Sequence, residues 1–138
     1  MPRSALEPVS EAVYATLNVS ALTDLATGGL FESVPQDPSF PLVWWTLRES
    51  DTAGTFGQVF KSVELNVNVF SAYRGGQEAQ QIVNKVVDLL RGASLSLSNH
   101  TSLQVTHESS RALPDKKDAA GVLLKHYVAE FELLVAED

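Results

Sequence analysis

The fold is decided by residues 58–92, which read QVFKSVELNVNVFSAYRGGQEAQQIVNKVVDLLRG. Apolar and polar side chains alternate over residues 59–72, the period-two pattern of a half-buried strand. After Gly76 the apolar residues recur every three or four positions, which predicts one amphipathic helix ending at about Leu90. Gly92 follows, where a left-handed C-terminal cap is usual. We therefore expect this strand and helix to pack apolar face against apolar face.

Length and composition restrict the class of protein. The 138 residues suit a single domain over residues 1–138, and the absence of cysteine excludes a disulfide framework and thiolate metal sites. The net charge of −7 opposes attraction to nucleic-acid phosphates, so sequence-specific DNA binding is not expected. No segment approaches the roughly 20 apolar residues of a membrane span, and we expect a soluble protein with no membrane partner.

The remaining pattern predicts an α+β fold. The expected elements are a helix from Pro8, a short helical piece over 20–26, strands over 30–34, 42–49 and 59–72, the central helix, and strands from about 102 and over 122–135. Residues 50–57 read as a hairpin connection and residues 114–118 as a polar turn. The prediction is a mainly antiparallel sheet of about five strands with two helices on one face, in the order α-β-β-β-α-β-β.

Two adjacent tryptophans occupy the strand over residues 42–49. As neighbours in a strand, Trp44 and Trp45 must point to opposite faces of the sheet. Trp45 alternates with Val43 and Leu47 and is assigned to the core, which places Trp44 on the outer face. Two interpretations of Trp44 remain open: a second layer such as the first helix covers it, or it contacts another protein.

The candidate chemical groups do not form a catalytic site. His107 and His126 lie on strands that would pair, but no third ligand stands at a spacing that suits zinc, so two unrelated histidines are the simpler interpretation. Arg74-Gly75-Gly76 lacks the further glycine or the Gly-Lys-Ser/Thr of a phosphate-binding loop. Lys116-Lys117 is more consistent with a solvated turn than with a phosphate site. We predict no catalytic residue, cofactor or metal.

The order of these elements, together with several short sequence motifs within them, resembles the tail-completion family of long-tailed bacteriophages. This family comprises tail terminator, or tail-to-head joining, proteins, which also occur in prophages and gene transfer agents. The resemblance extends from about Val9 to Val135. It is carried by Ala21-Leu22, Gly28-Gly29-Leu30-Phe31, Val34-Pro35-Gln36-Asp37, Phe40-Pro41-Leu42-Val43, Leu65-Asn66-Val67-Asn68-Val69-Phe70-Ser71, residues 76–90, Arg111-Ala112-Leu113-Pro114-Asp115 and Phe131-Glu132-Leu133.

Two departures from the family pattern stand out. Relatives often carry Trp-Ser where this chain has Phe70-Ser71, and they commonly carry an Asp-Gly turn where this chain has a longer, lysine-containing segment over residues 114–121. The first is an exchange of one aromatic residue for another. The second bears on any contact made by this turn.

The resemblance implies a structural virion protein rather than an enzyme. Such proteins form a homo-hexameric ring on the head-proximal end of the tail tube, stop tube polymerisation, and offer a surface to the neck, or stopper, protein of the capsid. The implied location is the head–tail junction of the virion, reached from the host cytoplasm, with DNA passing through the lumen without specific binding. The residues we expect to contact other subunits or the tube are Trp44, Asp51, Thr52, Phe56, Lys116 and Lys117.

Two alternatives remain at this point. The chain could be another neck, connector or tube component, which would differ in its place in the particle. It could also be a small-ligand-binding domain or enzyme on the same architecture, because a fold alone does not determine function. A deep pocket that combines His107 or His126 with a carboxylate would favour the second alternative.

Overall fold

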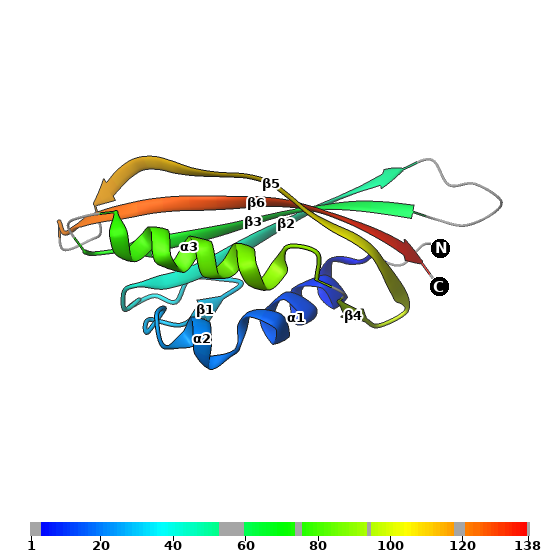
Figure 1. Cartoon of the computed structure of the whole chain (residues 1–138), viewed down its shortest axis with the longest axis horizontal. Helices are drawn as coiled ribbons and strands as arrows, with labels where there is room; N and C mark the ends of the chain where they lie inside the picture. The colour runs from blue at the N-terminus through cyan, green and yellow to red at the C-terminus, as the bar shows by residue number, and fades with distance from the viewer. Residues whose placement is uncertain (1–3, 53–59, 74–75, 94, 118–120, 138) are drawn as a thin grey trace.

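The computed structural model describes residues 4–52, 60–73, 76–93, 95–117 and 121–137. Its elements are α1 (Leu6–Leu17), α2 (Ser20–Thr23), β1 (Leu30–Phe31), β2 (Leu42–Thr52), β3 (Phe60–Ser71), α3 (Gln77–Leu90), β4 (Ser96–Leu97), β5 (His100–Lys117) and β6 (Leu123–Glu137). The strands form one twisted sheet, and the helices lie on one side of it (Figure 1). Within the described residues, no helix is both long and apolar enough to cross a membrane.

The sheet has six strands in the order β1-β2-β3-β6-β5-β4. All neighbouring pairs are antiparallel except β1 and β2, which run parallel. The predicted α+β class and mainly antiparallel sheet are confirmed, but the counts of five strands and two helices are wrong. The additional strand is β4, which pairs only through Ser96 and Leu97. The third helix is the four-residue α2, which lies within the short helical piece expected over residues 20–26 but was not included in the count of two helices.

Two predicted boundaries are also wrong. The expected turn at residues 114–118 belongs to β5 as far as Lys117, because a register shift between Leu113 and Lys116 allows Pro114 to lie in the strand without donating to the β6 ladder. The expected connection from residue 50 starts later, since β2 stays paired with β3 as far as Thr52. In both places, pairing with a distant strand outweighs the local turn signal.

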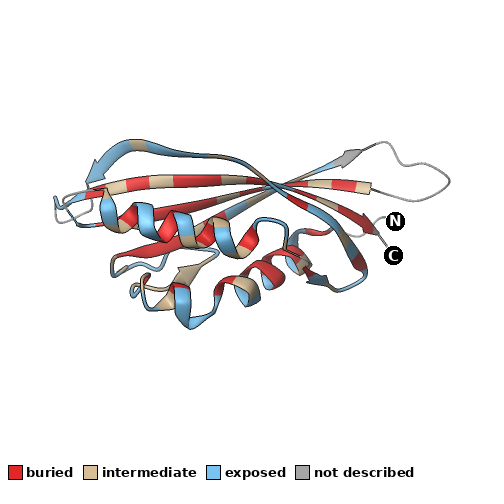
Figure 2. Cartoon of the chain, in the orientation of Figure 1, coloured by how far each residue is buried: buried red, intermediate tan, exposed pale blue. Residues whose placement is uncertain are grey.

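Helix α3 packs on the centre of the sheet as predicted. Its buried residues are Ala79, Ile82, Val83, Val86 and Leu90, and the inward residues of β3 and β6 beneath it are fully buried from Val63 to Val69 and from Ala129 to Val135. Figure 2 shows this single core between helices and sheet. The chain turns after the helix at Gly92, whose φ of +68° is the predicted left-handed conformation.

Helix α1 covers the β2 side of the same face. It buries Val9, Val13 and Leu17, and its Ser10 Oγ accepts a hydrogen bond of 3.2 Å from Trp45 Nε1. Trp45 is only 2% exposed, and its ring lies 6.3 Å from that of Tyr14. The assignment of Trp45 to the core is therefore confirmed.

A pair of oppositely charged side chains, Lys61 and Glu49, lies at one end of this core. Lys61 is 2% exposed on the inward face of β3, and its Nζ lies 3.4 Å from Glu49 Oε1 on β2. Glu49 also accepts hydrogen bonds from the Ala5 backbone N–H (3.0 Å) and from Ser4 Oγ (2.9 Å) at the start of α1. Burial raises the pKa of Glu49, but these donors and the Lys61 ammonium lower it more, so the pKa lies below its usual value. The ionised carboxylate thus ties the start of α1 to the sheet.

We predict that Glu49→Gln lowers the free energy of unfolding by about 2 kcal/mol at pH 7, because it leaves the buried Lys61 ammonium without this carboxylate. The value is below the roughly 3–5 kcal/mol of a fully buried pair because Glu49 keeps some contact with water. A carboxyl with a lowered folded pKa stabilises above its unfolded pKa of 4.5, and that contribution is lost as the pH falls through the folded pKa. The difference between wild type and variant should therefore shrink in acid.

Urea unfolding followed across the pH range measures this difference. The control is Glu64→Gln, which removes an exposed carboxylate from the neighbouring strand and should not destabilise the fold, because it relieves the repulsion between Glu64 and Glu132 and can raise stability by up to about 1 kcal/mol. Equal effects of the two substitutions at pH 7 would contradict the role assigned to Glu49.

Candidate interaction surface

The sheet face opposite the helices, here called the outer face, carries Trp44. The predicted opposite orientation of the two tryptophans is confirmed, and α1 contacts Trp45 rather than Trp44. Trp44 is nevertheless half-buried: its ring stacks on Phe70 with centroids 6.2 Å apart and planes at 22°, and its Nε1 donates a 2.9 Å hydrogen bond to the Glu32 carbonyl oxygen. Both its ring and its polar atom are therefore held in place.

Phe70 is the centre of a row that crosses four strands. Its ring stacks on His126 of β6 with centroids 4.3 Å apart, and Lys116 Nζ of β5 lies 5.9 Å from the ring centroid. Trp44 and Lys116, which sequence analysis proposed separately as contact residues, therefore lie on the same patch. We call Trp44, Phe70, His126 and Lys116 the aromatic row. Sequence analysis missed Phe70 and His126 as members, because only the strand register places them beside Trp44.

His126 is a neutral buried member of the row. It is 5% exposed, its Nε2–H donates to Asn68 Oδ1 at 2.9 Å, and its Nδ1 is buried with no hydrogen-bond partner. Burial, aided by the positive charge of Lys116, lowers the pKa of His126 to about 4. At neutral pH the uncharged ring therefore packs against Phe70. Protonation in acid makes it an unfavourable buried cation.

The second candidate histidine lies elsewhere. His107 is opposite Phe131 in the β5–β6 register and interacts through Nε2 with Ser110 Oγ at 2.8 Å, whereas His126 is opposite Leu113. The two rings therefore do not meet, which removes the geometric basis for a shared metal ion. The described part of the chain contains no group of three potential His, Cys, Asp or Glu ligands.

The other expected contact residues are spread over the molecule. Lys117 is exposed beside Lys116 at the end of β5. Asp51 and Thr52 belong to β2 and not to a loop, and they pair with Lys61 and Phe60 at the opposite end of the strand from Trp44. Phe56 lies outside the described residues, as do Arg74 and Gly75. The structure thus places Trp44 and Lys116 on one patch and separates them from Asp51 and Thr52.

Carboxylates gather on the rest of the outer face. A hollow of about 380 Å³ is lined by Arg48, Ser50, Ser62, Glu64, Glu108, Glu130 and Glu132. Glu64 stands directly opposite Glu132 across the β3–β6 ladder, an arrangement of like charges that costs stability. Arg111 Nη2 balances part of this charge at 3.0 Å from Glu130 Oε1. The outer face is therefore aromatic at one end and acidic further along.

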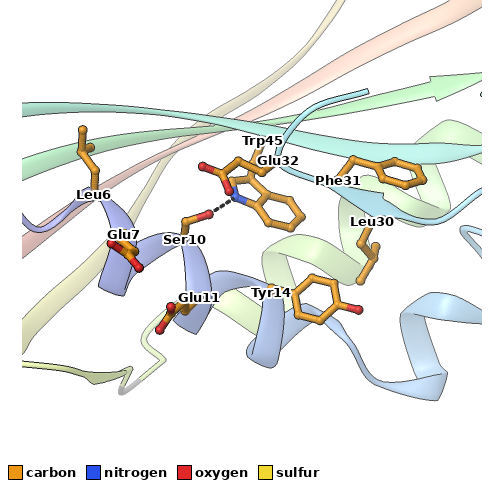
Figure 3. A pocket seen from close by; sticks show the side chains of 9 residues that line it. All are labelled: Leu6, Glu7, Ser10, Glu11, Tyr14, Leu30, Phe31, Glu32 and Trp45. Atoms are coloured by element: carbon orange, nitrogen blue, oxygen red, sulfur yellow. Dashed lines mark hydrogen bonds between the residues drawn. The ribbon is translucent and has the colours of Figure 1, made fainter. Parts of the chain in front are cut away.

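A larger hollow lies between α1 and β1 (Figure 3). It has a volume of about 730 Å³, and its lining combines apolar side chains such as Leu6, Tyr14 and Trp45 with the carboxylates Glu7, Glu11 and Glu32. Neither His107 nor His126, on which the enzyme alternative rested, lines it. Its chemistry suits an apolar segment that carries positive charge.

Comparison with known proteins identifies the family. Residues 11–136 match the family described as tail completion protein gp17. The chain belongs to this family. Its members are structural proteins of phage tails, so this tail completion protein is not an enzyme.

A solved structure has the same fold. A chain in "Virion of native gene transfer agent (GTA) particle" superimposes with a TM-score of 0.82, covering 98% of this chain and 99% of that one at 18% sequence identity. No curated protein matches. The resemblance to the tail-completion family drawn from the sequence is thus confirmed by the family match, and the α+β fold is shared over nearly the whole chain.

We predict that this tail completion protein loses stability as the pH falls from 6.5 toward 4. Over this interval the unfolded chain protonates at His126 while the folded chain does not, so the loss grows to a limit of about 3 kcal/mol. His126→Phe should keep the stack on Phe70 but cannot titrate, and the variant should show a flatter profile between these pH values.

The measurement is the free energy of urea unfolding at closely spaced pH values. The variant leaves Asn68 Oδ1 without its donor, which adds an offset at every pH without changing the slope. Parallel profiles for wild type and variant would contradict the assignment of a lowered pKa to His126.

Proposed function

We propose that this protein forms a hexameric ring that caps the head-proximal end of a tail tube. The ring stops tube polymerisation and joins the tail to the neck of the capsid. The observation that carries the proposal is the match of residues 11–136 to the tail completion family. The shared fold with a chain of a gene transfer agent virion supports a place in a phage-like particle.

The proposed partners are further copies of the chain, the tail tube protein and the neck, or stopper, protein. A ring built from heterologous contacts uses two different patches on each subunit and closes only if the rotation between subunits is suitable. The aromatic row with Lys117 offers one such patch, and Asp51, Thr52 and Phe56 are proposed to contribute a separate contact. The proposed location is the head–tail junction of the virion, with assembly in the host cytoplasm.

The charge of the chain suits a ring around passing DNA. Ten basic against 17 acidic side chains give the net charge of −7, and four glutamates line the hollow on the outer face. A negative wall repels phosphates, so DNA can pass without binding. Such a wall requires that the acidic part of the outer face line the lumen.

The test is the mass of the protein in solution, alone and with purified tail tubes, measured by light scattering and negative-stain microscopy. We expect one closed ring at one end of each tube and no further tube growth. Continued growth by addition of this chain would indicate a tube component instead. A persistent monomer that ignores tubes would contradict the proposal.

A substitution tests the aromatic row. Trp44→Ala should preserve a cooperative fold, because Trp44 lies outside the main core, at a cost of about 1–2 kcal/mol from the lost stack and hydrogen bond. Binding to tube ends or to other copies should weaken at least tenfold, as expected when an interface tryptophan is truncated. Thermal unfolding and tube binding are measured in parallel. An unfolded variant, or undiminished assembly, would overturn the interface role of Trp44.

A further inference from the structure

Within the described part of the chain, most of one sheet edge has no neighbouring strand. The parallel strand β1 pairs only with Val43 and Trp44, and among the described residues the rest of β2 pairs with β3 alone. The Val43 N–H bonds to the Gly29 carbonyl, away from β3, so alternation directs the backbone groups of Trp45, Leu47 and Glu49 to the same open side. The β2–β3 register is continuous from Leu42 to Thr52, which leaves an edge without bulges that can accept another strand.

A hollow runs along this open edge. It has a volume of about 540 Å³, and its lining includes Trp44 and Thr46 from one face of β2 and Trp45 and Leu47 from the other. Because successive side chains of a strand point to opposite faces, a hollow that touches all four lies beside the edge itself. It shares Leu6, Glu32 and Trp45 with the hollow of Figure 3, so the two adjoin and form what we call the β2 socket.

The chemistry of the β2 socket specifies what can occupy it. Its apolar lining is partly open to water, with Leu6 37%, Tyr14 46% and Val34 40% exposed. Three carboxylates line it, those of Glu7, Glu11 and Glu32, and the described lining residues include no lysine or arginine. The matching occupant is an extended segment that combines apolar and cationic side chains.

The chain itself carries that chemistry at the other side of its sheet. At the end of the β5–β6 hairpin, Lys116 and Lys117 are exposed, and Val122 and Leu123 are 44% and 49% exposed. Three strands separate β5 from β1 in the sheet, so a subunit cannot reach its own β2 socket with this hairpin. A hairpin end that matches the β2 socket is therefore available to it only from a second copy.

We propose that the β2 socket receives the β5–β6 hairpin end of a second copy of this chain. The inference rests on the proposed ring and specifies its subunit contact. Within one copy β5 runs antiparallel to β2, so a rotation that preserves strand direction brings the β5 of the next copy antiparallel to the open edge. The contact uses two different patches, and an open assembly of copies therefore keeps one free socket at one end and one free hairpin at the other until the ring closes.

Charge reversal tests the contact. A hairpin variant, Lys116→Glu/Lys117→Glu, and a socket variant, Glu7→Lys/Glu11→Lys, should each shift the protein to monomer in light scattering. The two reversals combined in one chain should restore the oligomer. A mixture of the two single-patch variants should also restore oligomers, in which the two variants alternate, because the socket of each variant is complementary to the hairpin of the other.

The matched control is Asp88→Lys/Arg91→Glu, which reverses two exposed charges on and just after α3 and should leave the oligomer unchanged. Circular dichroism confirms that each variant is folded. Oligomers that persist through both single-patch reversals, or a combined variant that stays monomeric, would overturn the proposal.

Cross-linking provides a readout that does not require a stable oligomer in dilute solution. The chain has no native cysteine that could react. The variant Glu11→Cys/Lys117→Cys, treated with a short bis-maleimide, should therefore give a ladder of covalent multimers joined only through the two introduced cysteines. The single-cysteine variants and a Glu11→Cys/Arg91→Cys control should remain monomers. Absence of the ladder would overturn the socket contact.

The two proposals fail separately. A chain that forms the ladder but never caps tubes contradicts the proposed function and leaves the subunit contact intact. Tube capping that survives the charge reversals contradicts the β2 socket and leaves the proposed function intact.

Discussion

The structure depends on the burial of one face of a six-stranded sheet under helices that cover no other surface. The inward residues of β3 and β6, among them Leu65 and Phe131, are fully buried because α3 and α1 lie on them. At about 25 cal/mol per Å² of apolar surface, this burial is the main source of stability. The helices leave the outer face and the open edge of β2 uncovered, so helix packing does not stabilise these two surfaces.

The outer face carries packed aromatic rings at one of its ends. Trp44, Phe70 and His126 pack across three strands, and Lys116 lies over the central ring. Further along, Glu64 faces Glu132 across the ladder, a pairing that costs up to about 1 kcal/mol relative to a neutral pair. Such a carboxylate pair does not stabilise the folded chain. It is consistent with a surface whose negative charge has its role in the assembled particle.

Local periodicity was sufficient to predict the centre of the fold. Strand β3, helix α3, the left-handed Gly92 and the opposite faces of Trp44 and Trp45 all follow from patterns within a few residues of each other. The continuation of β5 through Pro114 does not, because it depends on pairing with β6 and on a register shift. The aromatic row was missed for the same reason: Trp44, Phe70 and His126 become neighbours only through the registers of three strands.

The two edges of the sheet differ in how they resist unwanted pairing. Three register shifts and Pro114 interrupt β5, which are features that discourage long strand addition, whereas β2 has a continuous register and an open hollow beside it. A net charge of −7 also makes copies repel one another in general. That repulsion is screened beyond about 8 Å at physiological salt, so close contact between the exposed lysines of one copy and the carboxylates beside β2 of another remains attractive. The difference between the two edges, together with the short-range attraction, favours one directional contact between copies over nonspecific pairing of sheet edges.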